Sequence, residues 1–151
     1  MHYKLDVNTN YKETLITIQT SKITDSINEL TTFIDQLTHS ILVYKDNLQV
    51  EINIQSIIYL ESFERKTFLY TEADMYEIDS PLYEIEKNLE TFELIRINKQ
   101  TIINPRYIKS VKALLNSRYE LLMTSKEKLI VTRHYRKSFK ELFIAGGIYH
   151  A

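Results

Sequence analysis

The chain of 151 residues contains no cysteine, and its only two glycines, Gly146 and Gly147, are adjacent near the C-terminus. Without cysteine there is no disulfide, no thiolate metal site and no cysteine nucleophile. Phosphate-cradling loops and dinucleotide fingerprints need glycine between a strand and a helix, so that backbone amides can approach the ligand closely. The sequence therefore excludes nucleotide-dependent enzymes of those classes. It also has no glycine-flanked serine that would form a nucleophile turn.

Long hydrophobic runs and metal-ligand spacings are absent as well. No apolar run approaches the roughly 18 residues that a membrane span requires, and charged residues interrupt the first twenty positions. We therefore expect neither a secretion signal nor a membrane span, and a cytoplasmic location. We interpret the histidines as surface residues and expect the two terminal ones to be disordered. No catalytic set can be named, so we expect no enzyme, no cofactor, no metal and no small-molecule substrate. The four histidines are His2, His39, His134 and His150.

The net charge at pH 7 is only −1, but the charge is distributed unevenly along the chain. Residues 1–56 carry 4 basic and 7 acidic groups (net −3), residues 57–93 carry 3 and 10 (net −7), and residues 94–151 carry 12 and 3 (net +9). A phosphate backbone responds to the local field, so the last third can bind DNA while the middle third repels it. The alternative is that the basic and acidic surfaces pair with each other in the fold. Charge alone favours DNA over that alternative.

Residues 1–44 predict two strands followed by a helix. Apolar residues alternate with polar ones over residues 3–7, a turn is expected at residues 8–10, and residues 15–18 form a β-branched run, which is typical of a hairpin. Thr24 or Asp25 can cap a helix whose apolar residues recur at three- and four-residue steps. The resulting stripe could pack on a sheet or on a second subunit. It is formed by Ile27, Leu30, Ile34, Leu37 and Ile41.

From residue 41 onward, short apolar runs are separated by polar turns, which predicts an antiparallel β architecture. Ser80 and Pro81 mark the start of one short helix, and a basic amphipathic helix is expected over residues 133–143. In that last helix we place Phe139, Leu142 and Phe143 on one side. The expected strands cover residues 41–44, 48–54, 57–60, 66–70, 75–78, 94–97, 108–115, 118–124 and 128–131.

The densest pattern is the block FELIRINKQTIIN at residues 92–104, followed by TRHYRKSF at residues 132–139. Both segments place basic and amide side chains at the ends of apolar strand-like runs. The pattern resembles the LytTR DNA-binding domain of bacterial transcription regulators, and IIYLE at residues 57–61 is similar to the strand that opens that domain. An ordered set of motifs is far more specific than any one of them. The matching positions in the two segments are Phe92, Arg96, Ile97, Lys99, Ile102, Asn104, Thr132, Arg133 and Tyr135.

The resemblance implies a mainly β fold with short helices (α+β), built as a stack of small antiparallel sheets. It also implies that double-stranded DNA is read from loops and strand ends at one edge. Arg and Lys can donate to guanine O6 and N7, while Asn and Gln can address adenine or phosphate. The DNA-facing candidates are Arg65, Lys66 and Thr67 in a turn, Asn98, Lys99 and Gln100 in a loop, and Arg133, with Arg136 and Lys137 near the phosphates.

Other matching positions are assigned to the fold. Asn104, which precedes Pro105, is placed to bond the backbone of a corner. Arg96 lies inside an apolar strand, where it either pairs with an acidic neighbour such as Glu61 or reaches phosphate. The departures from the family pattern include Gln100, where serine is usual, so base preference does not carry over. The core positions are Phe92, Ile97, Ile102, Ile103 and Ile108.

We divide the chain into an N-terminal strand-strand-helix extension (1–44), a LytTR-like DNA-binding domain (45–143) and a C-terminal tail (144–151). About 45 residues are too few for the phospho-receiver of a response regulator. The resemblance is therefore to stand-alone LytTR regulators, which are often encoded beside a small membrane protein that restrains them. Two hypotheses for the extension are dimerisation through the apolar stripe and docking of such an inhibitor.

The resulting expectation is a bacterial transcription regulator that reads promoter repeats, acts as a homodimer and lacks its own phospho-receiver. The alternative is a protein-interaction or anti-activator module that keeps the LytTR-like fold and has lost DNA binding. The net charge of +9 on residues 94–151 argues against this alternative.

Overall fold

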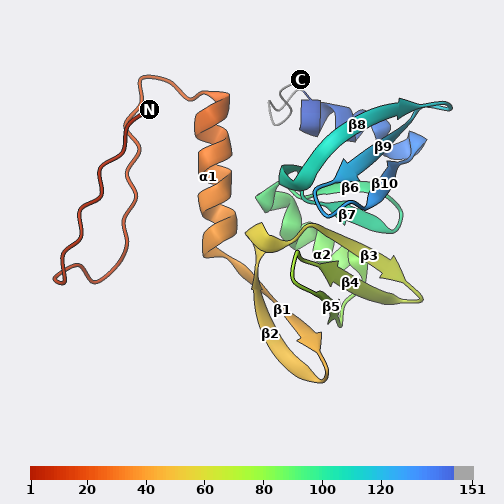
Figure 1. Ribbon diagram of the computed structural model, residues 1–151, viewed down its shortest axis with the longest axis horizontal. Coiled ribbons are helices and arrows are strands. Elements are labelled where there is room, and N and C mark those ends of the chain that lie inside the picture. The colour runs from red at the N-terminus through yellow and green to blue at the C-terminus, as the bar shows by residue number, and fades with distance from the viewer. Residues whose placement is uncertain (145–151) are drawn as a thin grey trace.

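The computed structural model describes residues 1–144 of the protein. Gly146, Gly147, His150 and all but the first residue of the predicted tail lie outside the described residues. Two antiparallel sheets lie one above the other, helix α1 stands beside them, and the N-terminal residues extend away from the rest as an irregular loop (Figure 1).

The larger sheet has seven strands in the order β2-β1-β5-β4-β3-β7-β6, and the smaller sheet has three in the order β10-β9-β8. All pairings within them are antiparallel, which confirms the predicted fold class. The larger sheet contains β1 (Ser40–Lys45), β2 (Leu48–Asn53), β3 (Tyr59–Phe63), β4 (Lys66–Tyr70), β5 (Met75–Ile78), β6 (Ile95–Asn98) and β7 (Thr101–Ile103). The smaller sheet contains β8 (Ile108–Leu114), β9 (Arg118–Met123) and β10 (Lys128–Val131).

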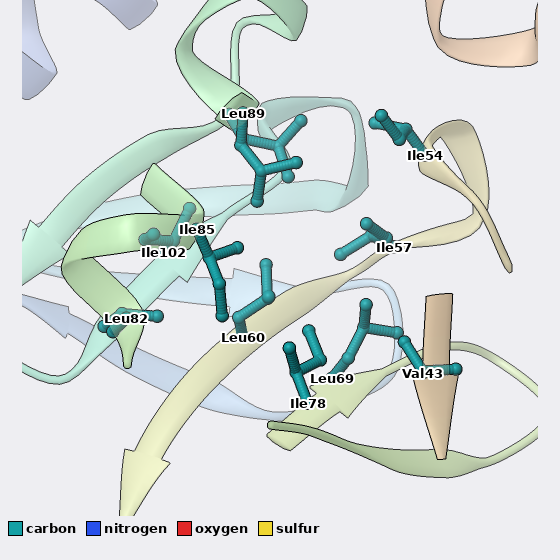
Figure 2. Close-up of a cluster of buried hydrophobic side chains, with 11 residues drawn as sticks. Val43, Ile54, Ile57, Leu60, Leu69, Ile78, Leu82, Ile85, Leu89 and Ile102 are labelled. Carbon is teal, nitrogen blue, oxygen red and sulfur yellow. The ribbon is translucent and has the colours of Figure 1, made fainter. Parts of the chain in front are cut away.

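The central strands of the larger sheet are buried on both faces, which explains the adjacent apolar residues in their sequences. Ile102 of β7 belongs to one core, together with the apolar side of α2 (Leu82–Leu89). Figure 2 shows Ile85 of α2 directed at Leu60 of β3 in that core. The next residue, Ile103, belongs to a second core between the two sheets, which also includes Leu121 and Phe139.

The C-terminal helical segment is predicted correctly in position but is irregular. It consists of a 3-10 turn (Arg133–Tyr135), α3 (Arg136–Phe139) and a π-helical turn (Lys140–Ile144). The rings of Phe139 and Phe143 stack with their centroids 5.0 Å apart inside the core. The prediction that Leu142 shares their side is wrong, because its side chain is 54% exposed. Four-residue spacing keeps the two phenylalanines on one side, whereas Leu142 points away from it.

Helix α1 (Asp25–Thr38) begins as predicted, with the hydroxyl of Thr24 accepting the Ile27 N–H at 3.4 Å. It ends earlier than the predicted stripe, because Ile41 pairs with Ile52 in the β1–β2 ladder. The helix docks on the domain through polar and aromatic contacts. The amide of Gln36 donates to the Phe92 carbonyl at 2.7 Å, and the Arg106 guanidinium lies 4.4 Å from the centre of the Phe33 ring.

The predicted N-terminal hairpin has its turn but not its strands. Tyr11 N–H donates to the Asn8 carbonyl at 3.1 Å, yet residues 1–24 contain no strand. The alternating side chains Tyr3, Leu5 and Val7 are exposed. An isolated two-stranded hairpin is only marginally stable in water, and no sheet within the described residues receives this one. The prediction of two paired strands is therefore wrong for the single chain.

Candidate nucleic-acid interface

Three segments that are far apart in the sequence meet at one end of the sheets, which we call the basic end. The segments are the β3–β4 turn, the β6–β7 loop and the turn at Arg133–Tyr135. Ser62 N–H donates to the Gln100 carbonyl at 2.7 Å, which places the first two side by side. Thr132 N–H donates to the Ile97 carbonyl at 3.0 Å, which fixes the third beside β6. The β3–β4 turn and the β6–β7 loop lie on the right of Figure 1.

The β3–β4 turn projects Arg65 and Lys66 into solvent. Glu64 and Arg65 have φ angles of 47° and 68°, so both adopt the left-handed conformation that a two-residue hairpin turn requires. The Lys66 ammonium is 3.8 Å from the Glu77 carboxylate, and both side chains are mostly exposed. Such an exposed pair contributes little to stability, so Lys66 remains available to another anion.

Thr67 does not face solvent, and its predicted DNA contact is inconsistent with its position. Its side chain is 0% exposed, and its hydroxyl donates to the Ser80 carbonyl at 2.9 Å. Side chains alternate between the faces of a strand, so Lys66 points outward while Thr67 points inward. We therefore assign Thr67 to the attachment of β4 to the segment that precedes α2.

Within the β6–β7 loop, Lys99 and Gln100 are exposed and Asn98 is not. The Asn98 amide donates to the Ile130 carbonyl of β10 at 2.9 Å, and its oxygen accepts the Gln100 N–H at 2.9 Å. Both ends of this side chain are thus used within the protein. Asn98 fixes the loop to the smaller sheet, and the tip presents Lys99 and Gln100.

Arg96 stabilises the same loop from the opposite side. Its Nε donates to the Asn98 carbonyl at 2.9 Å, one terminal nitrogen donates to the Lys99 carbonyl, and the other lies 2.6 Å from the Glu86 carboxylate. Of the two interpretations of this arginine, the structural ion pair is the one observed, with Glu86 of α2 rather than Glu61 as its partner. Hydrogen bonds to charged groups are roughly twice as strong as neutral ones, so Arg96 holds the loop firmly.

At the C-terminal segment, Arg133 and Lys137 are exposed, whereas Arg136 is half-buried. The Arg136 guanidinium lies 5.0 Å from the centre of the Tyr119 ring, a cation–π contact that fixes its stem. Arg136 is therefore a less mobile donor than its two neighbours. Asn104 is fully buried and accepts the Arg106 N–H at 3.2 Å, consistent with its assignment to a backbone corner.

The sequence interpretation missed one cation at the basic end. Val131 pairs with Tyr119, so Arg118 at the start of β9 lies next to the segment that leads to Arg133. Arg118 is exposed and follows the β8–β9 turn, where Asn116 and Ser117 both have positive φ. The signal was present in the sequence, since a predicted hairpin turn immediately precedes an arginine in the basic third of the chain.

Most cations of the basic third are not neutralised by ion pairs. Among residues 1–144 the ion pairs are Lys45–Asp74, Lys66–Glu77 and Arg96–Glu86, so only Arg96 of that third takes part in one. This arrangement does not support the alternative in which basic and acidic surfaces pair with each other. The exposed arginines and lysines leave a positive local field at the basic end.

No group of three or more metal-ligating side chains occurs within residues 1–144, and none of their helices is long and apolar enough to cross a membrane. Burial raises the pKa of the Tyr59, Tyr70 and Tyr107 phenols above their ordinary value, so these groups stay neutral at physiological pH.

Comparison with known proteins agrees with this geometry. Residues 47–144 match the model of the LytTr DNA-binding domain family. The chain belongs to the LytTR family. The fold is also similar to a solved LytTr DNA-binding domain from a Bacillus cereus protein described as a methyl-accepting/DNA response regulator. That match has a TM-score of 0.65 and 23% identity, and it covers 69% of this chain and 95% of that one.

Two relatives differ in how much of their length is matched. The chain is 32% identical over 106 residues to the sensory transduction protein LytR of Staphylococcus saprophyticus, a match that covers 70% of this chain but only 42% of that protein. It is 27% identical over 143 residues to an uncharacterized HTH-type transcriptional regulator of Staphylococcus aureus, with coverage of 93% and 97%. Part of the N-terminal extension therefore also has a counterpart. The LytTR domain is a DNA-binding domain, and the Staphylococcus aureus relative is named as a transcriptional regulator.

Proposed function

We propose that this LytTR protein is a sequence-specific transcription regulator that reads repeated half-sites in promoter DNA through its basic end, acts as a dimer and is not controlled by a phospho-receiver within these 151 residues. The observation that carries the proposal is the meeting of the β3–β4 turn, the β6–β7 loop and the Arg133 segment at one end of the sheets. Loops on a rigid scaffold can hold base-reading groups in register, because the scaffold limits their motion.

The roles follow from exposure and bonding. Lys99, Gln100 and Arg133 have exposed ends, and we assign them to base edges or adjacent phosphates. Arg65, Lys66 and Lys137 are assigned to phosphates, which position the protein without reading sequence. Arg136 and Asn98 are assigned a supporting role beside these residues, since both are held by contacts within the protein.

Fragments selected from genomic DNA would supply the operator, and gel-shift titrations would then test the site. We expect Lys99→Ala and Arg133→Ala to weaken binding about 10–100-fold each, since one well-placed contact supplies about 1–3 kcal/mol. Lys126→Ala is the matched control, because Lys126 is exposed in the β9–β10 turn at the opposite end of the smaller sheet. Unchanged affinity in both site variants would reject the assignment.

Salt dependence tests the electrostatic part of the proposal. About six cations at the basic end would give a slope of about −5 in log affinity against log salt concentration. A protein-interaction or anti-activator module would bind none of the selected fragments at any salt concentration. We also propose a cytoplasmic location, since promoter DNA is there. The proposed membrane-protein inhibitor would dock on residues 1–44, and co-purification from membranes tests this.

A further inference from the structure

In the N-terminal arm, residues 1–23, few backbone groups form hydrogen bonds, and most large apolar side chains are exposed to solvent. No hydrogen bond or ion pair joins the arm to the rest of residues 1–144. The backbones of residues 3–7 and 14–18, the two strand-like runs, form no hydrogen bonds at all within the described chain. Eight large apolar side chains of the arm are exposed: Met1, Tyr3, Leu5, Val7, Tyr11, Leu15, Ile16 and Ile23.

The larger sheet has one edge that can receive a strand. Within residues 1–144, β2 pairs only with β1, so the backbone groups on its outer side have no strand partner there. Proteins usually protect such an edge with proline, a bulge or inward-pointing charges. β2 has a regular register over all six residues and contains no proline. Leu48 at its start is 68% exposed, and Leu42 and Tyr44 of the neighbouring β1 are also exposed.

The arm matches this edge in length, pattern and charge. Residues 3–7 and 14–18 are five-residue runs, and β2 has six residues. In residues 14–18, Ile16 and Ile18 share one face, as do Val50 and Ile52 in β2. The arm carries three lysines and two acidic residues, whereas the β1–β2 hairpin carries one lysine and two acidic residues. The opposite signs of these net charges favour association.

The exposed apolar surface is large enough to support a dimer. Because side chains alternate between the two faces of a strand, about four of the eight would be buried on each arm, roughly 800 Å² for the two arms at roughly 100 Å² per side chain, and the receiving surfaces bury a similar area, on the order of 1,600 Å² in total. This value is typical of a specific, stable protein–protein interface. A strand added along β2 would also gain backbone hydrogen bonds that the arm now lacks.

We propose that the arm of one copy adds to the free edge of β2 in a second copy, and that the exchange is reciprocal. The arm joins α1 at Asp25, and β1 follows the other end of that 14-residue helix, which is about 21 Å long at 1.5 Å per residue. A second copy is favoured over the arm's own β2, because no hydrogen bond joins the arm to its own β1–β2 hairpin in the described chain. Figure 1 shows the arm extending away from its own β1–β2 hairpin. Reciprocal exchange uses the same two surfaces twice and closes with two-fold symmetry.

Disulfide trapping in the full-length chain tests the pairing directly, since the protein has no cysteine of its own. Gln49→Cys in one batch would be mixed with Thr14→Cys, Leu15→Cys, Ile16→Cys or Thr17→Cys in a second batch. We expect a covalent heterodimer for alternate arm positions only, because side chains alternate along a strand. No crosslink at any position would overturn the proposal. So would a doubly substituted chain that crosslinks only within itself.

Light scattering supplies an independent measurement. The wild-type protein is expected at twice the 18.0 kDa of the chain. Leu5→Glu with Ile16→Glu should weaken the dimer by about 100-fold or more, since two charges per arm would be buried. Both residues are exposed in the single chain, so its thermal unfolding should not change. Leu142→Glu, an exposed leucine outside the arm, is the matched control. A wild-type monomer at tens of micromolar would overturn the proposal.

The proposal extends the proposed function, since two linked copies would present two basic ends to a repeated site. The two can fail separately. The arm variant should bind a single half-site with wild-type affinity while losing its advantage on a double site. Lys99→Ala should lose binding to a single half-site while the dimer stays intact, and this result tests the DNA-binding role of the basic end without testing the arm.

Discussion

The two edges of the larger sheet differ in how they are completed. At the β6 edge, β10 and the following turn cover the strand, Thr132 bonds to Ile97, and Arg96 and Asn98 hold the loop. At the β2 edge, no second strand within residues 1–144 pairs with β2, and Leu48 is exposed. The comparison separates two requirements. Reading DNA calls for a loop of fixed shape, whereas adding a partner strand calls for an open row of backbone groups.

The largest expected difference between the edges is in stability. Ile97→Ala in β6 should lower the free energy of unfolding by about 3 kcal/mol, because it leaves a cavity in a closed core. Ile97 is fully buried between the two sheets. Val50→Ala in β2 should cost about 1 kcal/mol or less, since Val50 is only half-buried and the site can relax. Urea unfolding of the two variants at a concentration that favours monomer checks this, and equal losses would contradict it.

The second prediction concerns the β6–β7 loop. Arg96→Ala should weaken operator binding about 10–30-fold, since the loop carbonyls and Glu86 lose their common donor. Its salt slope should match the wild type, because Arg96 supports the loop without contacting phosphate. A direct phosphate contact would instead reduce the slope by about 1. Arg96→Lys should not restore binding, since an ammonium cannot reach three acceptors in a plane. A lowered slope or full rescue by lysine would reject this role.

The third prediction compares two neighbours in that loop. Asn98→Ala should destabilise the fold by about 1–2 kcal/mol, because two hydrogen bonds are lost and the Ile130 carbonyl is left without its partner. Gln100→Ala should leave stability within about 0.5 kcal/mol, since its side chain is exposed. Its effect should instead be on base preference, measured by competition between operator variants. If Gln100→Ala destabilised the protein and Asn98→Ala did not, their roles would be reversed.

Sequence patterns predicted the strands correctly where the strand lies inside the sheet. They were less accurate where strand formation depends on a pairing partner that the single chain does not provide. The runs around Leu60, Leu69 and Ile102 are strands because cores on both faces accept them. Residues 3–7 have an equally regular alternation but no sheet to join, so the strands do not form in the single chain. Alternation predicts a strand only where an edge is available.

The basic end was predicted by residue type, but not the use of each polar group. The sequence does not show that Thr67 points inward or that both ends of the Asn98 amide are occupied. The first depends on which residues of β4 face the core. The second depends on the Ile130 carbonyl, which is 32 residues away in the sequence. Glu86 was not chosen as the partner of Arg96, because the position of α2 over the sheet follows from tertiary packing. The family resemblance predicts which positions belong to the site, whereas only the structure shows which hydrogen bonds each side chain forms.

The smallest expected effect separates a supporting ion pair from an incidental one. The Arg96–Glu86 pair has side chains 16% and 29% exposed, whereas the Lys66–Glu77 pair has side chains 63% and 52% exposed. Glu77→Gln should therefore change the free energy of unfolding by less than about 0.5 kcal/mol. It should raise DNA affinity about 2–3-fold at low salt, because it removes a negative charge and frees Lys66, and the gain should vanish as salt screens the interaction. Glu86→Gln should instead lower affinity, because it weakens the support of the loop. Titrations of both variants at two salt concentrations measure this contrast, and a gain for both would show that charge alone, and not loop shape, determines binding.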